Sequence, residues 1–439
     1  MIFKRKLYNK LLAWKHQAAG TKALLIEGAR RIGKSTLVEE FAKNEYRSYL
    51  LIDFNKVSDS VVSAFNNYMN DLDTFFLILS SEYGVKLYSK ESVIIFDEIQ
   101  QFPKARQAIK YLVADGRFDY IETGSLISIK ENVKDITIPS EERALTMYPM
   151  DFEEFAWAMD EEPLMTYIRQ CFDKRVPLEQ GLHAKAMLLF RQYMIVGGMP
   201  KSLSAYMENN RSFEMADMEK RDILTLYRND IMKINSGYRS SVLSIFDQIP
   251  AFLSRSERRV VMNRIEKGAS FPKYHDTFFW LSDSMIANEC FNCSDPNVGL
   301  SLNEDRTYVK CYMGDTGLLI SHTFDENEIS DGELYREILL GKLSVNEGMF
   351  YENVIAQMLV AAGHKLYFYT RYNEEKHRND VEIDFILSNQ SKLKYKIFPI
   401  EVKSNDKYTI RSLTRFNESF HQRIGAVSYT HLRAHETPE

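Results

Sequence analysis

Runs of consecutive apolar residues alternate with amphipathic stretches in the N-terminal part of the chain. Such runs are typical of buried parallel strands, and apolar residues at helical spacing between them indicate connecting helices. The runs expected to form strands are 23–26, 49–54, 93–96, 120–122 and 144–148. The stretches expected to form helices are 7–17, 34–44, 57–83 and 104–114. This alternation predicts an α/β fold with a doubly wound parallel sheet.

A glycine-rich loop directly follows the first expected strand. Residues 28–35 read Gly-Ala-Arg-Arg-Ile-Gly-Lys-Ser and fit the pattern G-x-x-x-x-G-K-[ST] at every fixed position. In such a loop, backbone N–H groups surround a phosphate and the helix N-terminus adds partial positive charge. We expect Lys34 to reach the β- and γ-phosphates of ATP and Ser35 to bind Mg²⁺. The alternative, a chance glycine-rich turn, is disfavoured by the flanking strand and helix. The predicted nucleotide-binding residues are Gly28, Ala29, Arg30, Arg31, Ile32, Gly33, Lys34, Ser35 and Thr36.

Polar residues end two further strands of the expected sheet. The apolar run 93–96 is followed by Asp97 and Glu98. We expect Asp97 to belong to the Mg²⁺ shell and Glu98 to orient or deprotonate the attacking water, which together with Lys34 makes a hydrolytic site. Thr123 and Ser125 follow the next strand, where a hydroxyl can sense the γ-phosphate or the water. An exposed acidic turn and a polar turn are the alternative interpretations of these two segments.

The middle of the chain is expected to be largely helical up to about residue 235. Asp151 and Glu154 form an acidic version of a capping box, and Gly197-Gly198-Met199-Pro200 interrupts the helical pattern. We interpret this stretch as a helical lid that closes over the nucleotide. Residues 236–313 then change to short helices followed by a β-wing, which is typical of a winged helix-turn-helix. A solvated charged face remains the alternative to DNA contact here. The basic residues of this segment are Arg255, Arg258, Arg259, Arg264, Lys267 and Lys273.

Acidic residues recur on the expected elements of the C-terminal part. Glu352 lies on an expected helix over 346–360, Asp384 on a strand over 381–387, and Glu401 with Lys403 on a strand over 397–402. Carboxylates in this order, ending in Glu-x-Lys, are typical of a Mg²⁺-dependent nuclease, in which the lysine positions the nucleophile or stabilises developing charge. A Glu/Lys pair on an edge strand is the alternative.

The composition restricts the possible classes of function but does not identify one. The 439 residues are 45% hydrophobic and 27% charged, as in ordinary soluble proteins, and suffice for two or three domains. The net charge of −5 means that nucleic-acid contact requires a local basic face. No stretch approaches the ~18 apolar residues of a membrane span, and we expect a cytoplasmic protein without membrane contact. The four cysteines indicate a reducing compartment; for Cys290, Cys293 and Cys311, reduced thiols are favoured over a zinc site.

With these residues assembled, the chain resembles a prokaryotic ATPase family of the AAA+ class that joins an ATPase module to a C-terminal DUF4143 domain. The segments that carry the resemblance are 28–35, 96–98, 123–125, 151–155, 197–200, 314–318, 382–385 and 400–403. The family usually has Gly-Arg where this chain has Glu142-Arg143, so no sensing or trans-acting role is assigned to Arg143. Residues 428–437 resemble a translated sequencing adapter, so we expect 429–439 to be a non-native tail and exclude it from the fold prediction.

The resemblance implies a domain order. We expect an ATPase core over 1–155, the lid over 156–235, the winged-helix segment over 236–313 and a PD-(D/E)XK nuclease-like domain over 314–428. It assigns Lys34, Ser35, Asp97 and Glu98 to the ATPase site, and the acids of the C-terminal part to a nuclease-like site.

Our expectation is a protein that hydrolyses Mg-ATP and uses the cycle to rearrange a nucleic-acid-related C-terminal module. Two alternatives stay open at this point. One is an ATP-gated DNA endonuclease, and the other is a nucleotide-switched binding regulator that does not hydrolyse ATP. Whether the chain forms a homo-oligomer also stays open.

Overall fold

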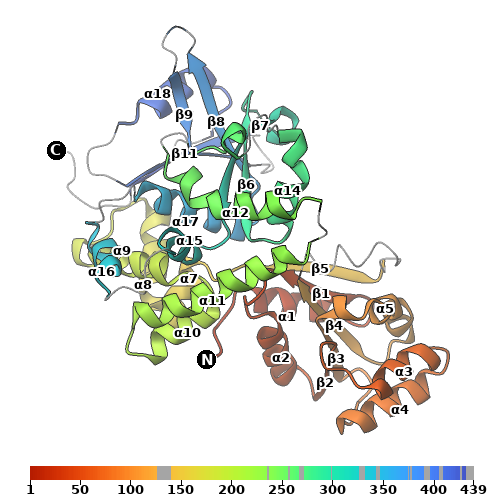
Figure 1. Cartoon of the computed structure of the whole chain (residues 1–439). Coiled ribbons are helices and arrows are strands. Elements are labelled where there is room, and N and C mark those ends of the chain that lie inside the picture. The colour runs from red at the N-terminus through yellow and green to blue at the C-terminus, as the bar shows by residue number, and fades with distance from the viewer. Residues whose placement is uncertain are drawn as a thin grey trace. The chain divides into compact units, whose positions relative to one another are not determined.

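The computed structural model divides the chain into two compact units, Met1–Tyr148 and Pro149–Glu439 (Figure 1). It describes residues 1–125, 140–234, 237–255, 258–265, 271–297, 299–325, 332–342, 347–373, 375, 378–389, 396–404, 409–425 and 428–431. The predicted boundaries at residues 155, 235, 313 and 428 all lie within the second unit and stay predictions.

The first unit is a parallel sheet of five strands in the order β2-β3-β4-β1-β5. Its strands are β1 (Ala23–Gly28), β2 (Ser48–Asp53), β3 (Ser92–Asp97), β4 (Asp119–Ser125) and β5 (Glu142–Met147). Its helices are α1 (Leu7–Gln17), α2 (Lys34–Glu45), α3 (Asp59–Asn67), α4 (Leu72–Tyr83), the short 3₁₀ helix η1 (Ile99–Gln101) and α5 (Pro103–Asp115). The predicted doubly wound α/β sheet is confirmed.

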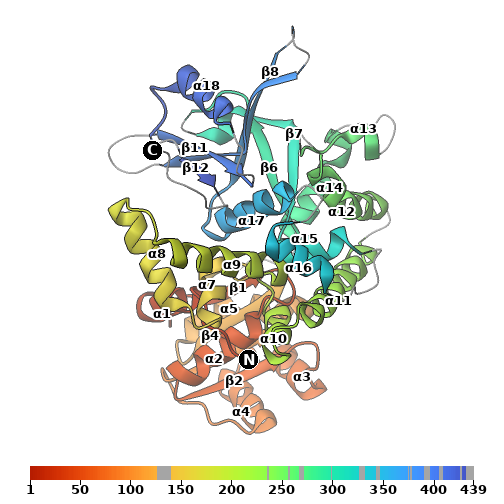
Figure 2. The same ribbon diagram turned by 90° about the vertical axis from the view of Figure 1, so that its left-hand side faces the viewer.

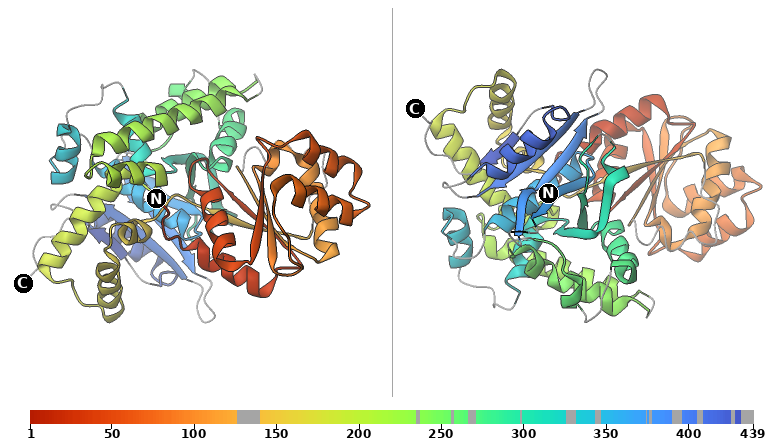
Figure 3. Two further views of the ribbon diagram at one scale, coloured as in Figure 1. Left: turned by 90° about the horizontal axis from the view of Figure 1, so that it is seen from below. Right: turned by 90° about the horizontal axis from the view of Figure 1, so that it is seen from above.

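Helices cover both faces of this sheet (Figure 3). On one face, α3, α4 and α5 pack their apolar side chains onto the strands in a single core that includes Phe65, Phe75 and Phe96. On the other face, α2 contacts β1 to β4. The single helix expected over 57–83 is instead two, because Ser58 caps α3 by accepting from Val61 N, and Asp71 caps α4 by accepting from Thr74 N.

The second unit begins with helices and ends with two small sheets (Figures 1 and 2). Its helices are α7 (Phe152–Ala158), α8 (Glu162–Lys174), α9 (Gln180–Val196), α10 (Pro200–Glu208), α11 (Phe213–Met232), α12 (Arg239–Leu253), α13 (Met262–Ile265), α14 (Phe271–Asp283), η2 (Leu300–Asn303), α15 (Thr316–Thr323), α16 (Glu333–Leu340), α17 (Gly348–Ala361) and α18 (Arg411–Phe420). Its strands are β6 (Ala287–Cys293), β7 (Glu304–Met313), β8 (Leu366–Asn373), β9 (Arg378–Ile383), β10 (Phe385–Asn389), β11 (Lys396–Lys403) and β12 (Ser428–His431).

The sheets of the second unit combine segments that the sequence suggests are separate. β6 and β7 form the antiparallel pair expected of a wing, but β6 also pairs in parallel with β8 in a sheet ordered β7-β6-β8-β9. The strand expected over 381–387 is two strands, and Asp384 lies at the break where the chain passes from one sheet to the other. β12, which includes the first residues of the tail set aside above, pairs with β11.

A buried joint of backbone and polar side chains organises the start of the second unit. The Met150 N–H donates to the Gly198 carbonyl at 2.8 Å, and the Tyr193 hydroxyl donates to the Met150 carbonyl at 2.8 Å. A Cβ on Gly198 would lie within 3.0 Å of the Met150 backbone, so only glycine fits there. The Asp315 carboxylate accepts from the Gly198 N–H at 2.6 Å and from Gln357 Nε2 at 3.1 Å. The glycine motifs at 197–198 and 314–317 are therefore parts of one structural joint.

Candidate active site

The glycine-rich loop lies between β1 and α2, as the sequence predicts. Arg31 (φ 66°) and Gly33 (φ 91°) both have left-handed backbone conformations, which turn the loop sharply into the helix. Lys34 Nζ donates to the carbonyls of Gly28, at 3.1 Å, and Ala29, at 2.8 Å, and its side chain is buried. Burial lowers the Lys34 pKa to about 8, and the charges of Glu98 and Asp97 oppose this shift.

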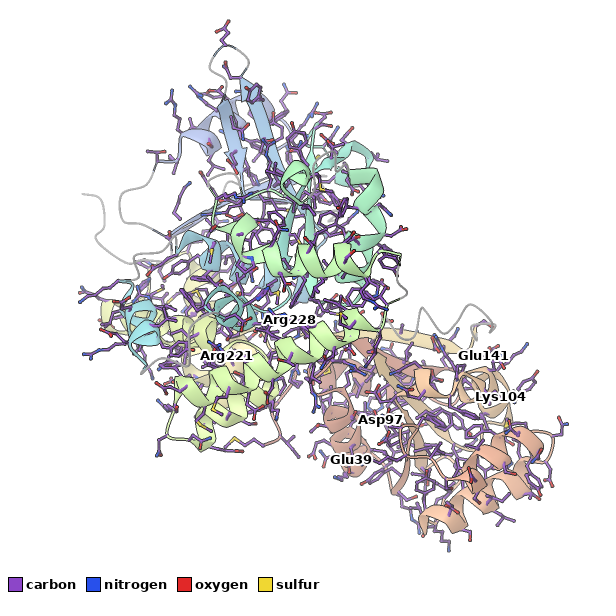
Figure 4. All side chains as sticks on the ribbon, viewed as in Figure 1. Glu39, Asp97, Lys104, Glu141, Arg221 and Arg228 are labelled. Carbon is purple, nitrogen blue, oxygen red and sulfur yellow. The ribbon has the colours of Figure 1, made fainter. Side chains whose placement is uncertain are left out.

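Three of the predicted polar residues meet beside this loop. Ser35 Oγ lies 2.7 Å from Asp97 Oδ1, and the Thr123 hydroxyl also donates to Asp97 Oδ1. The strand order explains this meeting, because β4 lies between β1 and β3 and so carries Thr123 to both. Figure 4 marks Asp97 among the side chains of the first unit.

The donors at this point fit Mg²⁺. Ser35 and Asp97 offer hard oxygen atoms side by side, and Mg²⁺ in phosphate-binding sites takes one or two protein oxygens together with phosphate and water. A bound Mg²⁺ would neutralise charge on the β- and γ-phosphates. Asp97 is buried and already accepts two hydroxyl hydrogen bonds, so its carboxylate is held in place.

Both the backbone conformation of Glu98 and its hydrogen-bonding neighbours determine where its carboxylate lies. It adopts a left-handed conformation (φ 54°, ψ 48°) immediately after β3, and its N–H donates to Thr123 Oγ1 at 3.4 Å. Gln100 Nε2 donates to the Glu98 carboxylate. The sequence pattern indicates no role for Gln100. Its position two residues after Glu98 was the signal that could have pointed to this contact. These hydrogen bonds hold the backbone and the carboxylate of Glu98 in one orientation.

The remaining predicted residues of the loop and of β4 lie around the same place. Ser125 is buried and pairs in register with Gly28, so the end of β4 runs beside the first glycine of the loop. Thr36 is exposed in the first turn of α2. The N–H groups of a first helical turn have no intrahelical partner, which suits them to an anion.

A second buried charge cluster lies in the sheet and involves Glu142. Arg106 pairs bidentately with Glu142, with Nη2–Oε1 at 2.7 Å and Nε–Oε2 at 3.0 Å. Glu122 is fully buried beside them, and burial, followed by the charge of Glu142, raises its pKa well above the ordinary value. These surroundings favour the protonated form of Glu122. The departure from the family pattern at Glu142 is thus compensated by Arg106.

The acids of the second unit come together, but around a lysine. Lys310 Nζ, fully buried on β7, lies 3.0 Å from Glu352 Oε1, 3.5 Å from Glu382 Oε1 and 3.9 Å from Asp384 Oδ1. Glu352 also receives the Tyr312 hydroxyl and pairs with Arg258. We call Lys310, Glu352, Glu382 and Asp384 the Lys310 cluster.

These residues do not fit a metal centre as they stand. The Lys310 ammonium lies within ion-pair distance of three of the carboxylates that a cation would need. Glu401 pairs with Lys403, and Asp384 Oδ2 accepts from the Val402 N–H at 2.8 Å. Within the described ranges, no group of three or more His, Cys, Asp or Glu side chains is placed to hold a metal ion. The role of Glu352, Asp384 and Glu401 as Mg²⁺ ligands stays a prediction, and we derive no step from it.

The predicted basic face has other contacts where it is described. Arg258 pairs with Glu352, and the Arg259 guanidinium lies 5.0 Å from the Tyr308 ring centroid. The side chains of Arg264, Lys267 and Lys273 lie outside the described residues. All four cysteines are free and buried. No helix in the described part of the chain is long and apolar enough to cross a membrane.

Comparison with protein families gives three matches along the chain. Residues 20–156 match an AAA domain, residues 187–328 match a domain of unknown function (DUF8612), and residues 347–439 match another domain of unknown function (DUF4143). A search of curated proteins returned no match.

Three of the solved structures that are similar to this chain are Cdc6p, DnaA and RuvB. Cdc6p from Pyrobaculum aerophilum has 10% identity, with 77% of this chain and 93% of that chain covered and a TM-score of 0.28. AMPPCP-bound DnaA from Aquifex aeolicus has 11% identity, with 64% and 90% covered and a TM-score of 0.26. The RuvB Holliday junction branch migration motor from Thermotoga maritima has 12% identity, with 65% and 89% covered and a TM-score of 0.28.

The AAA match covers the glycine-rich loop at 28–35 and the parallel sheet that carries it. The chain therefore joins a segment that matches an AAA domain, over residues 20–156, to a segment that matches a DUF4143 domain, over residues 347–439.

Proposed function

We propose that the first unit binds ATP with Mg²⁺ and hydrolyses it, and that this cycle rearranges the second unit. The observation that carries the proposal is the convergence of Ser35, Asp97 and Thr123 beside Lys34. A phosphate site needs a cation, a metal-binding hydroxyl and a carboxylate close together, and Lys34, Ser35 and Asp97 supply these three groups.

Each residue has a distinct role in this proposal. Lys34 exchanges its hydrogen bonds to two loop carbonyls for hydrogen bonds to phosphate oxygens. This exchange stabilises a buried ammonium more than an exposed one, because solvent screens the buried charge less. Ser35 and Asp97 hold the Mg²⁺. Glu98, oriented by Gln100, accepts the proton of the attacking water. Thr123 keeps Asp97 and the Glu98 backbone in register.

Two substitutions test whether ATP binding and ATP hydrolysis depend on different residues. Lys34→Ala should weaken ATP binding about 100-fold or more, because it removes the charge-assisted hydrogen bonds to phosphate. Glu98→Gln should keep ATP bound while lowering turnover by about 10²- to 10⁴-fold, because only the base is lost. Matched controls are Lys110→Ala and Glu82→Gln, both at exposed positions. Wild-type turnover in Glu98→Gln would remove the assignment of the base.

The proposal also concerns the macromolecule on which the second unit acts. Its relation to nucleic acid rests on the family resemblance and on the basic residues of 255–273. The test is ATP turnover measured with and without double-stranded DNA, for which we expect faster turnover with DNA. Unchanged turnover would point to a protein target. Measurable steady-state hydrolysis would dismiss the regulator that only switches. We do not extend the proposal to an endonuclease, because Lys310 occupies the middle of the acids that nuclease chemistry requires.

A further inference from the structure

Arg5 connects the nucleotide loop to the end of the first unit. It precedes α1, and its side chain is buried at 7% exposure. Its Nη1 donates to the Ile32 carbonyl at 3.0 Å, and its Nη2 donates to the Tyr148 carbonyl at 2.6 Å. One planar guanidinium therefore holds two backbone carbonyls that lie far apart in the sequence.

The contact to Ile32 serves the shape of the loop. Ile32 lies between two left-handed residues, Arg31 and Gly33, and such turns direct successive N–H groups toward an anion and leave carbonyls on the other side. Ile32 is itself fully buried, and a buried carbonyl needs a donor. Arg5 supplies that donor and adds a permanent positive charge behind the phosphate cradle.

The contact to Tyr148 lies where the chain leaves the first unit. Tyr148 is the last residue of that unit, and the backbone of Met150 is fixed in the second unit through both its N–H and its carbonyl. Only Pro149, whose ring restricts φ, separates the two anchored residues. The loop has a second contact with this exit strand, because a Cβ on Gly28 would lie within 3.0 Å of the Met147 carbonyl.

We infer that Arg5 is a positioning residue of the nucleotide loop and that it also ties the loop to the connection between the two units. A change in the loop on nucleotide binding moves the Ile32 carbonyl, and the guanidinium passes that movement to Tyr148. The inference rests on the proposed function, since it requires that ATP binds at residues 28–36.

The test uses the full chain with Arg5→Met, Arg5→Lys and the control Lys10→Met, which alters an exposed lysine on α1. ATP affinity and turnover are measured for each, together with hydrogen exchange of peptides covering 148–151 and 193–198 with and without Mg-ATP. Arg5→Met should weaken ATP binding about tenfold or more, with a smaller effect on turnover at saturating ATP, because the residue shapes the loop without touching the reacting atoms. It should also abolish the ATP-dependent change in exchange at 148–151.

Arg5→Lys keeps the fold and the charge but not the two-pronged geometry, so it should recover part of the affinity and none of the exchange response. Either variant matching Lys10→Met in both affinity and exchange would overturn the inference. A stability loss without any change in ATP affinity would reduce Arg5 to a structural residue and also overturn it. A wild-type chain that fails to bind ATP would instead refute the proposed function.

Discussion

Replacing Lys310 by Met tests whether this lysine is the resident cation of the second unit. Met keeps most of the apolar length of the lysine side chain, so the substitution removes the ammonium and leaves a small change in packing. The ammonium lies 3.0 Å from Glu352, and neither side chain is exposed to solvent. Glu382 and Asp384 lie farther away, at 3.5 and 3.9 Å, and their side chains retain exposures of 28% and 12%.

The magnitude follows from which carboxylate loses its partner. Removing one member of a buried ion pair costs about 3–5 kcal/mol, because the other charge stays buried. Glu352 keeps the Tyr312 hydroxyl and Arg258, so we expect the lower end, about 3 kcal/mol. Adding Glu352→Gln removes the stranded charge, so the double variant should recover about half of that loss. Lys365→Met is the matched control: Lys365 pairs with Glu304 at 2.7 Å but is 55% exposed, and should lose less than about 1 kcal/mol.

Hydrogen exchange of peptides from β7 and α17 measures these losses locally, which avoids treating a chain of two units as a two-state system. A loss of about 3 kcal/mol corresponds to roughly 100-fold faster exchange in Lys310→Met. Equal exchange in Lys310→Met and Lys365→Met would refute the electrostatic reasoning. A second result would refute it independently. If millimolar Mn²⁺ slows exchange of α17 in the wild type, and Asp384→Asn removes the effect, a metal rather than Lys310 is the cation of this site.

Two predictions concern protons in the first unit. The Lys34 pKa is about 8 without ligand, and a bound phosphate favours the charged form. Binding of Mg-ATP at pH 8 should therefore take up about half a proton, and the affinity should fall as the pH rises above 8. Titration calorimetry in two buffers of different ionisation enthalpy measures this proton uptake, and equal binding heats in the two buffers would contradict it. Glu122→Gln should reduce the pH dependence of stability. Because the Glu122 pKa is raised, the folded chain binds more protons than the unfolded chain above about pH 4.5, so wild-type stability falls as pH rises, by up to about 1.4 kcal/mol per pH unit. Hydrogen exchange of peptides from β4 between pH 5.5 and 8, corrected for the intrinsic pH dependence of exchange, should show a shallower decline of stability in the Gln variant. A parallel decline in both proteins would contradict the assignment of that proton to Glu122.

The sequence predicts most of the first unit because its signals are local. Four apolar residues before Asp97 indicate a buried strand, and the fixed spacing of 28–35 indicates the turn between strand and helix. Arg5 escapes this reasoning. A basic residue near a chain end indicates a solvated position, and only the folded chain brings the carbonyls of Ile32 and Tyr148 to it.

The second unit is predicted less well because its important contacts are non-local. Lys310 is the single charged residue in the otherwise apolar run 308–313 of β7, and a lone lysine is rarely fully buried. The opposing acids come from α17 and from the break at Asp384, and neither is close in sequence. For the same reason the antiparallel strands of the expected wing give no sign that one of them pairs with β8. Register between distant strands depends on packing that periodicity does not encode.

Two buried lysines in this chain illustrate how partners, rather than burial, decide what a cation does. Lys34 donates to two neutral carbonyls, burial lowers its pKa to about 8, and an anionic phosphate is the partner that would raise that pKa again. Lys310 already lies against three carboxylates, which supply the compensation that Lys34 would obtain from a ligand. A phosphate approaching Lys310 would meet the negative charge of those acids first. The same residue type is therefore suited to a ligand site in the first unit and to a charge-balanced core in the second.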